Sequence, residues 1–369
     1  MELFSACFPR RRPFFSKFSR SKSAPTSTTT APAVSSTEKA NGGSTVFNAQ
    51  TINHSYWDIY LAHRPTYSPS FYEIIYNYHR DIGNNSWHLA KDIGTGPGNV
   101  AAILSPKFDK IHASDPGATH VEVAKERLAR DGIQNVNVYQ STAEKLLSAG
   151  VTKPNTVDLL AVAEAMPLMD ARTSLDSFAQ ITAKGGTLAI WFYGRPIFVD
   201  PLTGGVETTR AARCQRIFDE ICIRAYSRIR PMKGTHWEVA SSTLFSWLDN
   251  VELPEDTWGK VRRYKWNADR PLAFYDEAAC DHSVVTKHVQ RRDGDEQRID
   301  VVDRSFWGKE WGINEVKEFI GVLLPQFTEN LSEEIAKDGF YDELERAMGG
   351  QGASMKISWP VVLILATKK

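Results

Sequence analysis

Between residues 87 and 192 the chain alternates regularly between short apolar segments and amphipathic ones, and this alternation most constrains the fold. The spacing predicts strands at 87–93, 110–114, 135–139, 157–163 and 187–192. It predicts helices at 98–105, 119–130 and 175–183, with a Gly185-Gly186 turn before the last strand. Segment 157–163 is apolar at nearly every position, which is typical of a parallel strand covered on both faces. We therefore expect an α/β fold with a doubly wound parallel sheet and right-handed crossovers.

The alternation is lost for about 150 residues after Tyr193. Within this part we expect short strands and charged loops over 252–303, and helices at 208–226, 313–324 and 332–348. The apolar segment 357–366 predicts a strand that returns to the sheet. These patterns divide the chain into a core at 46–193, a cap or substrate region at 194–350, and a returning C-terminal strand at 351–369.

Residues 1–45 differ from the rest in composition, being rich in Ser, Thr, Ala and Pro with a net charge of +5. Such a segment buries too little apolar surface to offset its ordering entropy, so we expect a disordered tail. Its Arg- and Ser-rich, acid-poor start also fits a mitochondrial transit peptide, although Pro9 and Pro13 interrupt the helix that such a signal requires. We expect a cytoplasmic protein, with mitochondrial import as the alternative.

Several classes of protein are disfavoured by composition. No apolar run reaches the roughly 18 residues of a membrane helix. The chain beyond residue 45 carries a net charge of −5, which argues against a long nucleic-acid footprint. The four cysteines have no metal-ligand spacing, and we expect reduced thiols and no metal site. Neither composition nor pattern distinguishes a monomer from a homodimer.

The segment that most directly indicates chemistry is Asp92-Ile93-Gly94-Thr95-Gly96-Pro97-Gly98-Asn99, at the first strand-to-helix turn. Glycines let the backbone turn tightly and approach a ligand, and the helix that follows favours negative charge at its N-terminus. Asn99 stands where a dinucleotide fingerprint has Gly or Ala. Asp92, at the strand's end, suits a ligand with a cationic amino group better than a pyrophosphate. A glycine turn without a ligand is the alternative.

Two further segments follow the second and third strands. Asp115 lies 17 residues beyond Gly98, where an acid can accept both hydroxyls of a ribose; alternatively it caps the turn before Pro116-Gly117. After the third strand, Ser141 and Glu144 have the spacing of a capping box. The exposed N–H groups of that turn can face an adenine ring at the same time.

These segments resemble the class I S-adenosylmethionine-dependent methyltransferases, and more narrowly the type 11, trans-aconitate-methyltransferase-like group common in fungi. The resemblance covers roughly residues 50–200 and implies a Rossmann-like seven-stranded sheet with an inserted helical and mixed cap. It implies S-adenosyl-L-methionine as cofactor. The positions it assigns to the cofactor are Asp92, Gly94, Thr95, Gly96 and Gly98 for the methionine part, Asp115 for the ribose, and Thr142, Ala143 and Glu144 beside the adenine.

Two segments near the expected methyl group complete the resemblance. The pattern Tyr60-x-x-x-Arg64-Pro65-x-Tyr67 is similar to the family segment that closes over the cofactor, although aromatic helix packing explains it equally well. After the fourth strand the family usually reads Ala-x-Ala-x-His-Trp-Phe-Asp, whereas this chain has Pro167 and Leu168 in place of the His-Trp pair. The missing imidazole makes trans-aconitate itself doubtful as the acceptor.

Candidate substrate contacts are scattered along the chain, and we name Arg64, Met166, Arg195, His236 and Arg230. The aromatic residues of 237–275 indicate either an apolar pocket or the core of the cap. We expect a methyltransferase that methylates an oxygen of a small carboxylic acid or secondary metabolite. N- or C-methylation is the alternative reaction, and a non-catalytic cofactor-binding subunit is the alternative class. No catalytic residue is assigned.

Overall fold

The computed structural model describes residues 54–200, 204–205, 209–289, 295–324 and 330–369, all of which belong to one compact unit. The predicted tail at 1–45, with Cys7, lies outside the described residues. In the described part of the chain, no helix has the length and apolar character needed to cross a membrane.

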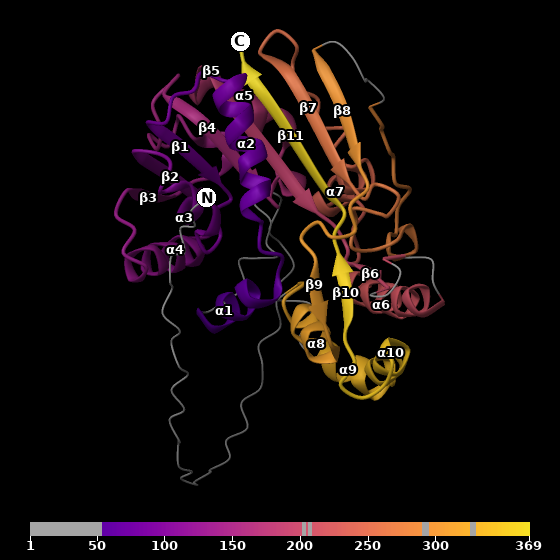
Figure 1. Ribbon diagram of the computed structural model, residues 1–369. Coiled ribbons are helices and arrows are strands. Elements are labelled where there is room, and N and C mark those ends of the chain that lie inside the picture. The colour runs from indigo at the N-terminus through magenta and orange to yellow at the C-terminus, as the bar shows by residue number, and fades with distance from the viewer. Residues whose placement is uncertain (1–53, 201–203, 206–208, 290–294, 325–329) are drawn as a thin grey trace, which may run out of the picture. The chain divides into compact units, whose positions relative to one another are not determined.

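The main structural element is a large mixed sheet (Figure 1). Its strands are β1 (Leu89–Ile93), β2 (Lys110–Asp115), β3 (Val136–Gln140), β4 (Val157–Ala163), β5 (Thr182–Tyr193), β7 (Trp258–Trp266), β8 (Glu296–Val301) and β11 (Val361–Lys368). They are arranged in the order β3-β2-β1-β4-β5-β11-β7-β8. The first five pair in parallel, and β11 is antiparallel to both β5 and β7. The predicted doubly wound parallel core is therefore confirmed.

The strand count is eight among the described residues, one more than the seven that the resemblance implies. The extra strand is β8, which pairs in parallel with β7 at the edge of the sheet. Both strands come from 252–303, inside the range predicted as cap. Part of the range 194–350 predicted as cap therefore belongs to the large sheet, because β7 pairs with β11 and β8 pairs with β7.

Helices flank the sheet, and the first group precedes or connects its parallel strands. This group consists of α1 (His54–His63), α2 (Pro69–Asp81), α3 (Asn99–Leu104), α4 (Ala118–Arg130), α5 (Ala171–Ile181) and the short turns η2 (Ala143–Lys145) and η3 (Met166–Leu168). The predicted turn at Gly185-Gly186 is wrong, since β5 runs through it. The pairing with β4 shifts there, from Val157↔Thr182 to Leu159↔Thr187, so the glycines form an irregularity inside the strand.

A second, antiparallel sheet carries the remaining helices. Its order is β6-β10-β9, from β6 (Ile197–Val199), β9 (Lys309–Trp311) and β10 (Met355–Ser358). The other elements are α6 (Thr209–Ser227), α7 (His236–Phe245), η4 (Glu277–Ala279), α8 (Ile313–Gly321), α9 (Leu331–Lys337) and α10 (Phe340–Met348). The helix predicted at 332–348 is thus two helices, because Gly339 takes a left-handed conformation with φ of 75° between them.

The two sheets are joined by the C-terminal segment. The single strand predicted at 357–366 is two strands, β10 and β11, which Figure 1 shows end to end, one in each sheet. Trp359 lies at the junction, fully buried, with its ring 5.2 Å from that of Tyr193 and 5.7 Å from that of Trp311. The returning strand therefore fixes the small sheet against the large one.

Candidate functional site

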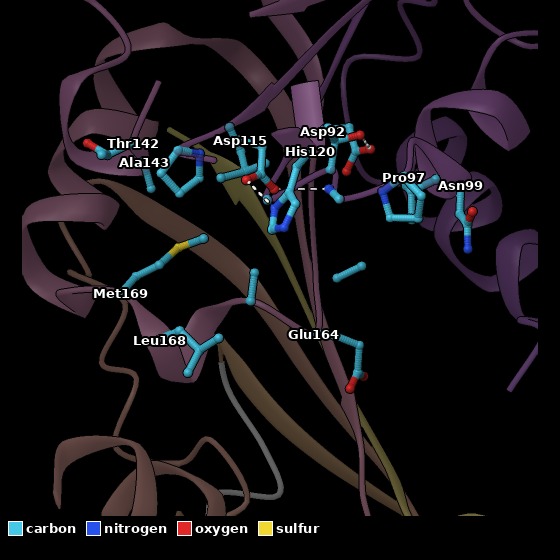
Figure 2. A pocket seen from close by; sticks show the side chains of 18 of the residues that line it. Asp92, Pro97, Asn99, Asp115, His120, Thr142, Ala143, Glu164, Leu168 and Met169 are labelled. Carbon is cyan, nitrogen blue, oxygen red and sulfur yellow. Dashed lines mark hydrogen bonds and ion pairs between the residues drawn. The ribbon is translucent and has the colours of Figure 1, made fainter. Parts of the chain in front are cut away.

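A cavity of about 180 Å³ lies at the carboxyl ends of β1, β2 and β4, where open α/β sheets bind their ligands. Figure 2 shows Asp115 and His120 together on one side of the cavity, and Leu168 and Glu164 on the other. Nine of the ten predicted cofactor residues line it, namely Tyr60, Asp92, Gly94, Thr95, Gly96, Asp115, Thr142, Ala143 and Glu144. Residues that the sequence predicts to bind one cofactor therefore lie around one cavity in the structure.

The three glycines of the first turn all have positive φ, but they serve different purposes. A Cβ on Gly94 would lie 2.7 Å from Ala165, which is too close, so close packing requires a glycine there. A Cβ on Gly98 would make only ordinary contacts of 3.4–3.5 Å with side-chain atoms of Leu128 and Ala124. A Cβ on Gly96 would meet only the Trp57 ring, at 3.7 Å. Gly94 and Gly96 both border the cavity, Gly96 with room on its side-chain face, and Gly98 does not line it.

Asp92 is buried at the end of β1 with its two oxygens in different situations. Oδ2 accepts hydrogen bonds from Thr95 Oγ1 (2.6 Å) and the Ala101 backbone N–H (3.1 Å). Oδ1 is buried and has no hydrogen-bond partner among the described residues. Burial raises the pKa of Asp92 to about 6, which a neighbouring cation would lower again. The cavity wall thus contains an acceptor that fits the amino group of S-adenosylmethionine.

Asp115 organises the turn as well as facing the cavity. Its Oδ2 accepts from the backbone N–H of Gly96 (3.0 Å). Its Oδ1 accepts from the N–H of Gly117 (2.9 Å) and pairs with Nδ1 of His120 (2.9 Å). A carboxylate has about four lone-pair positions, so one remains for a ligand hydroxyl. Turn capping and ligand binding are therefore compatible at this residue.

The third turn differs from its prediction. The capping box is not formed, because Thr142 rather than Ser141 is the N-cap of η2, and its side chain makes no capping hydrogen bond. Glu144 instead reaches the start of α5, where Oε1 accepts from the backbone N–H of Asp170 and from Ser174 Oγ, both at 3.4 Å. The backbone of the turn is left facing the cavity.

Helix α1 covers the glycine turn. Trp57 is only 3% exposed, and its ring lies 5.1 Å from that of His120 and 5.1 Å from that of Tyr60. Arg64, just after the helix, donates to Tyr193 Oη (3.2 Å) and to the carbonyl oxygens of Val322 (2.9 Å) and Leu323 (3.2 Å). Arg64 does not line the cavity. Its hydrogen bonds instead hold the end of α1 against the segment after α8, and we call this the Arg64 clamp.

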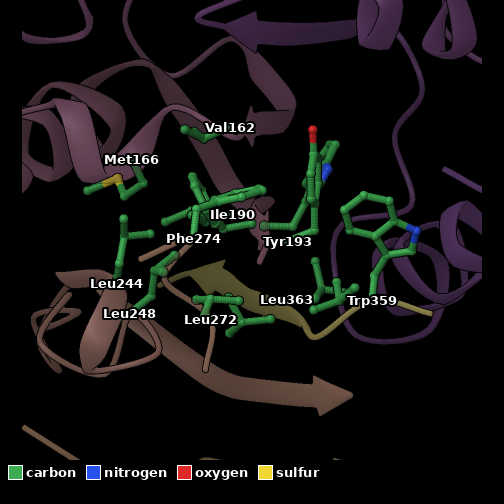
Figure 3. Packing of buried hydrophobic residues seen from close by; sticks show 14 of the residues in the cluster. Val162, Met166, Ile190, Tyr193, Leu244, Leu248, Leu272, Phe274, Trp359 and Leu363 are labelled. Carbon is green, nitrogen blue, oxygen red and sulfur yellow. The ribbon is translucent and has the colours of Figure 1, made fainter. Parts of the chain in front are cut away.

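The other predicted substrate contacts do not line the cavity either. Met166 is 1% exposed and packs in the core beside Leu244 (Figure 3). Arg195 is buried in ion pairs with Asp219 (3.2 Å) and Asp276 (2.8 Å). Both side chains make contacts within the protein that stabilise its fold. The sequence could not reveal these contacts, because the partner residues lie far along the chain.

Two further candidates also lie elsewhere. His236 begins α7, and Arg230 donates to the carbonyl oxygens of Ala278 and Ala279. The largest aromatic residues of 237–275 belong to the main hydrophobic core and are absent from the cavity lining. These aromatic residues therefore pack in the main core, and Trp258 and Trp266 lie on β7 of the large sheet rather than in a separate cap.

Sequence reasoning named Tyr67 and Leu168 within segments near the site without assigning them as site residues, and it missed Trp57, His120, Glu164 and Met169. His120 had a usable signal, since it follows Asp115 by five residues and lies in the first turn of α4. Glu164 had a weaker one, as a lone acid directly after an apolar parallel strand. Among the described residues, no group of three or more His, Cys, Asp or Glu side chains is arranged to hold a metal ion.

Comparison with known proteins identifies the class. A family model described as a methyltransferase domain matches residues 91–186. The chain is 41% identical to methyltransferase cfoB of Aspergillus candidus over 314 residues, covering 85% of this chain and 94% of that protein. It is 38% identical to pgmE of Aspergillus terreus (87% and 96% covered) and 36% identical to ptaI of Pestalotiopsis fici (85% and 93% covered). The chain belongs to the class I S-adenosylmethionine-dependent methyltransferases.

The protein is thus a methyltransferase enzyme whose cofactor is S-adenosylmethionine. Its similarity to these fungal proteins extends well beyond the matched domain into the second half of the chain. The narrower resemblance to the trans-aconitate-methyltransferase-like group stays a prediction.

Proposed function

We propose that the protein methylates an oxygen atom of a small-molecule acceptor, and that this acceptor is a secondary metabolite. The observation that carries the proposal is the covering of the site. Trp57 and Tyr60 of α1 lie over the glycine turn, and α1 is tied by Arg64 to the end of α8. A reacting centre beneath a packed helix suits a small molecule better than a folded macromolecule.

In this proposal the cofactor is held by the residues of the cavity. Asp92 Oδ1 accepts from its amino group, the backbone at Gly94–Gly96 borders its methionine part, Asp115 accepts from its ribose, and residues 142–144 flank its adenine. Bound S-adenosylmethionine supplies a methyl group already activated on a sulfonium. The protein therefore has to align the acceptor and exclude water.

The segment after β4 favours oxygen over carbon as the acceptor atom. Pro167 and Leu168 replace the imidazole-bearing pair that the resemblance leads one to expect, and Leu168 lines the cavity. A carboxylate acceptor needs no general base, and a hydroxyl needs only one proton acceptor. N- or C-methylation remains the alternative reaction. The alternative of a non-catalytic cofactor-binding subunit is set aside, because the chain is a methyltransferase enzyme.

The test combines genetics with isotope labelling. Deletion of the gene should remove one methylated metabolite from the profile of the source organism and leave its unmethylated precursor. Purified protein with that precursor and ¹³C-methyl-labelled cofactor should restore it, and the NMR shift of the labelled methyl identifies the atom that carries it. A methyl on nitrogen or carbon would overturn the oxygen proposal, and labelling of a macromolecule would overturn the small-molecule proposal.

A further inference from the structure

Glu164 is a cavity residue to which the preceding assignments give no task. It follows Ala163, the last residue of β4, and lines the cavity with Tyr60 and Tyr67. In Figure 2 its carboxyl group lies away from the Asp115–His120 pair that faces the predicted ribose position. It is therefore on the side of the cavity where the acceptor, rather than the nucleoside, would lie.

The backbone of Glu164 is held in an unfavourable conformation. Its φ is 57°, in the left-handed region that side chains other than those of Gly, Asn and Asp rarely adopt. Its N–H donates to the Trp191 carbonyl (3.0 Å), which fixes this geometry against β5. Strain of this kind costs on the order of 1–3 kcal/mol and clusters at functional sites. A glycine at this position would avoid the backbone strain, which indicates that the carboxyl side chain has a functional role.

The carboxyl group is anchored at one oxygen only. Oε1 accepts from the Tyr193 backbone N–H at 2.7 Å. Among the described residues no other hydrogen bond or ion pair to this carboxyl is found. The other carboxylates of the cavity are engaged differently: Asp92 and Asp115 accept hydrogen bonds within the glycine turn, and Glu144 accepts hydrogen bonds at the start of α5. Oε2 of Glu164 is thus a positioned oxygen with capacity to accept a proton.

The surroundings make this carboxyl a stronger base than an exposed one. Burial raises the pKa of Glu164 well above its usual value, and the nearby Arg64 charge offsets this only in part. The other titratable groups facing it are tyrosines: Tyr60 on α1, Tyr67 before α2, Tyr193 on β5 and Tyr226 on α6. Burial raises the pKa of each tyrosine, so they stay neutral. Within this cluster Glu164 is therefore the group best suited to accept a proton.

We propose that Glu164 is the general base of the reaction and that the acceptor atom is consequently a hydroxyl oxygen, an inference that rests on the proposed function. The new bond joins this oxygen to the methyl carbon. The carbon–sulfur bond of the donor breaks with its electron pair on sulfur, and the hydroxyl proton moves to Oε2. A carboxylate acceptor would bring a second negative charge beside Glu164, which disfavours it. A phenol or alcohol fits the site.

The first test uses Glu164→Gln, which keeps an oxygen for the Tyr193 N–H but cannot take up the proton. With the hydroxyl precursor found by profiling, kcat should fall by roughly 10²- to 10⁴-fold, while calorimetric affinity for S-adenosylhomocysteine stays unchanged. The rise of wild-type kcat/KM with pH through the Glu164 pKa should disappear in the variant. Glu73→Gln, at an exposed position of α2, is the matched control. Wild-type kcat in Glu164→Gln would overturn the inference.

A second measurement does not depend on turnover. Infrared difference spectra between wild type and Glu164→Gln, both with S-adenosylhomocysteine bound, should isolate one carboxyl band that titrates well above the ordinary glutamate range of about 4.3. Titration within that ordinary range would overturn the inference. Glu164→Gly should fold normally, because glycine adopts φ of 57° freely, yet be as slow as the Gln variant.

The two proposals can fail separately. If the labelled methyl is never found on oxygen, the proposed function fails whatever Glu164 does. If an O-methyl product forms and Glu164→Gln makes it at the wild-type rate, only the assignment of the base fails.

Discussion

The two halves of the described chain are built in different ways. In the first half, up to Tyr193, β1 to β5 form a parallel sheet whose consecutive strands are connected by local turns and helices. In the second half, the sheet is completed by partners from far along the chain: β11 pairs with β5 through Val361↔Tyr193, and β10 pairs with β6 through Lys356↔Val199. The local sequence pattern therefore determines how the strands of the first half are arranged, whereas pairing between distant segments determines the arrangement of the second half.

The site follows the same division. Every residue that lines the cavity lies between Trp57 and Met169, so the second half contributes none of them. Its contribution is indirect. Tyr56 and Arg64, at either end of α1, donate to carbonyl oxygens just after α8. The comparison predicts that changes in the first half act on ligand binding directly, whereas the second half acts through the position of α1.

The largest expected effect is that of Gly96→Val. A branched side chain at φ of 51° would fill the side of the turn that borders the cavity and press on the Trp57 ring, so S-adenosylmethionine binding should be abolished. Gly132→Val is the matched control, because Gly132 also has a positive φ (74°) but a Cβ there would have no neighbouring atom within 4 Å. Calorimetry measures both, and tight binding by Gly96→Val would contradict the role of the turn.

The next effect tests the link between the halves. Arg64→Met removes the donor from two buried carbonyl oxygens, and we expect a loss of roughly 2–4 kcal/mol in the free energy of unfolding together with weaker cofactor binding. Urea unfolding and calorimetry measure the two quantities. Arg80→Met, at an exposed position of α2, is the control and should change neither. Lost stability with unchanged cofactor affinity would show that α1 does not need its clamp to cover the site.

The same division explains what the sequence could predict. The five parallel strands and nine of the ten cofactor residues follow from local signals, because an apolar strand and the turn after it lie within a few residues of each other. Arg64, Arg195 and Met166 were assigned to substrate because their partners, such as Val322 for Arg64, are distant in sequence. An isolated arginine or methionine carries no sign of whether its partner is a ligand or the protein.

Asp115→Ala should have a moderate effect. It removes charge-assisted hydrogen bonds worth roughly 1.5–3 kcal/mol, or about 10- to 150-fold in cofactor affinity. Because Asp115 also accepts from the Gly96 N–H, part of this loss comes from a loosened turn, and Asp115→Asn should lose less. Calorimetry compares these variants with Asp109→Ala, at an exposed position. An unchanged dissociation constant for Asp115→Ala would reduce Asp115 to a turn cap.

A smaller effect, of opposite sign, is expected at Lys91 on β1. The side chain is fully buried, its ammonium has no hydrogen-bond partner among the described residues, and burial lowers its pKa to about 7. The unfolded lysine, with a pKa near 10.4, binds a proton that the folded one lacks between about pH 7 and 10, so stability should rise with pH there. Below about pH 7 the ammonium of Lys91 is charged in both the folded and the unfolded state, so the folded protein bears the full cost of burying that charge.

Lys91→Met should therefore stabilise the protein at neutral pH by roughly 1–2 kcal/mol and flatten the rise between about pH 7 and 10. Urea unfolding across this pH series measures both effects. Lys110→Met, on β2 at an exposed position, should do neither. Destabilisation by Lys91→Met would mean that the lysine contributes a favourable interaction to the first half.

The smallest effect is expected from removing the N-terminal tail, because every residue that lines the cavity lies after residue 56. A shortened chain beginning at Gly43 should keep the cofactor affinity and thermal midpoint of the full chain. A drop in either would show that residues before the described part support the site.

The location of the protein in the cell tests a second property of the N-terminal tail, namely whether it acts as a transit peptide. The acid-poor, Arg-rich start favours import into mitochondria, whereas Pro9 and Pro13 oppose it because each removes a helical N–H and disrupts the preceding turn. We expect a diffuse cytosolic fusion and a mature N-terminus near Met1. N-terminal sequencing of the native protein measures this directly. A start between about residues 20 and 45, together with mitochondrial fractionation, would instead identify a cleaved transit peptide.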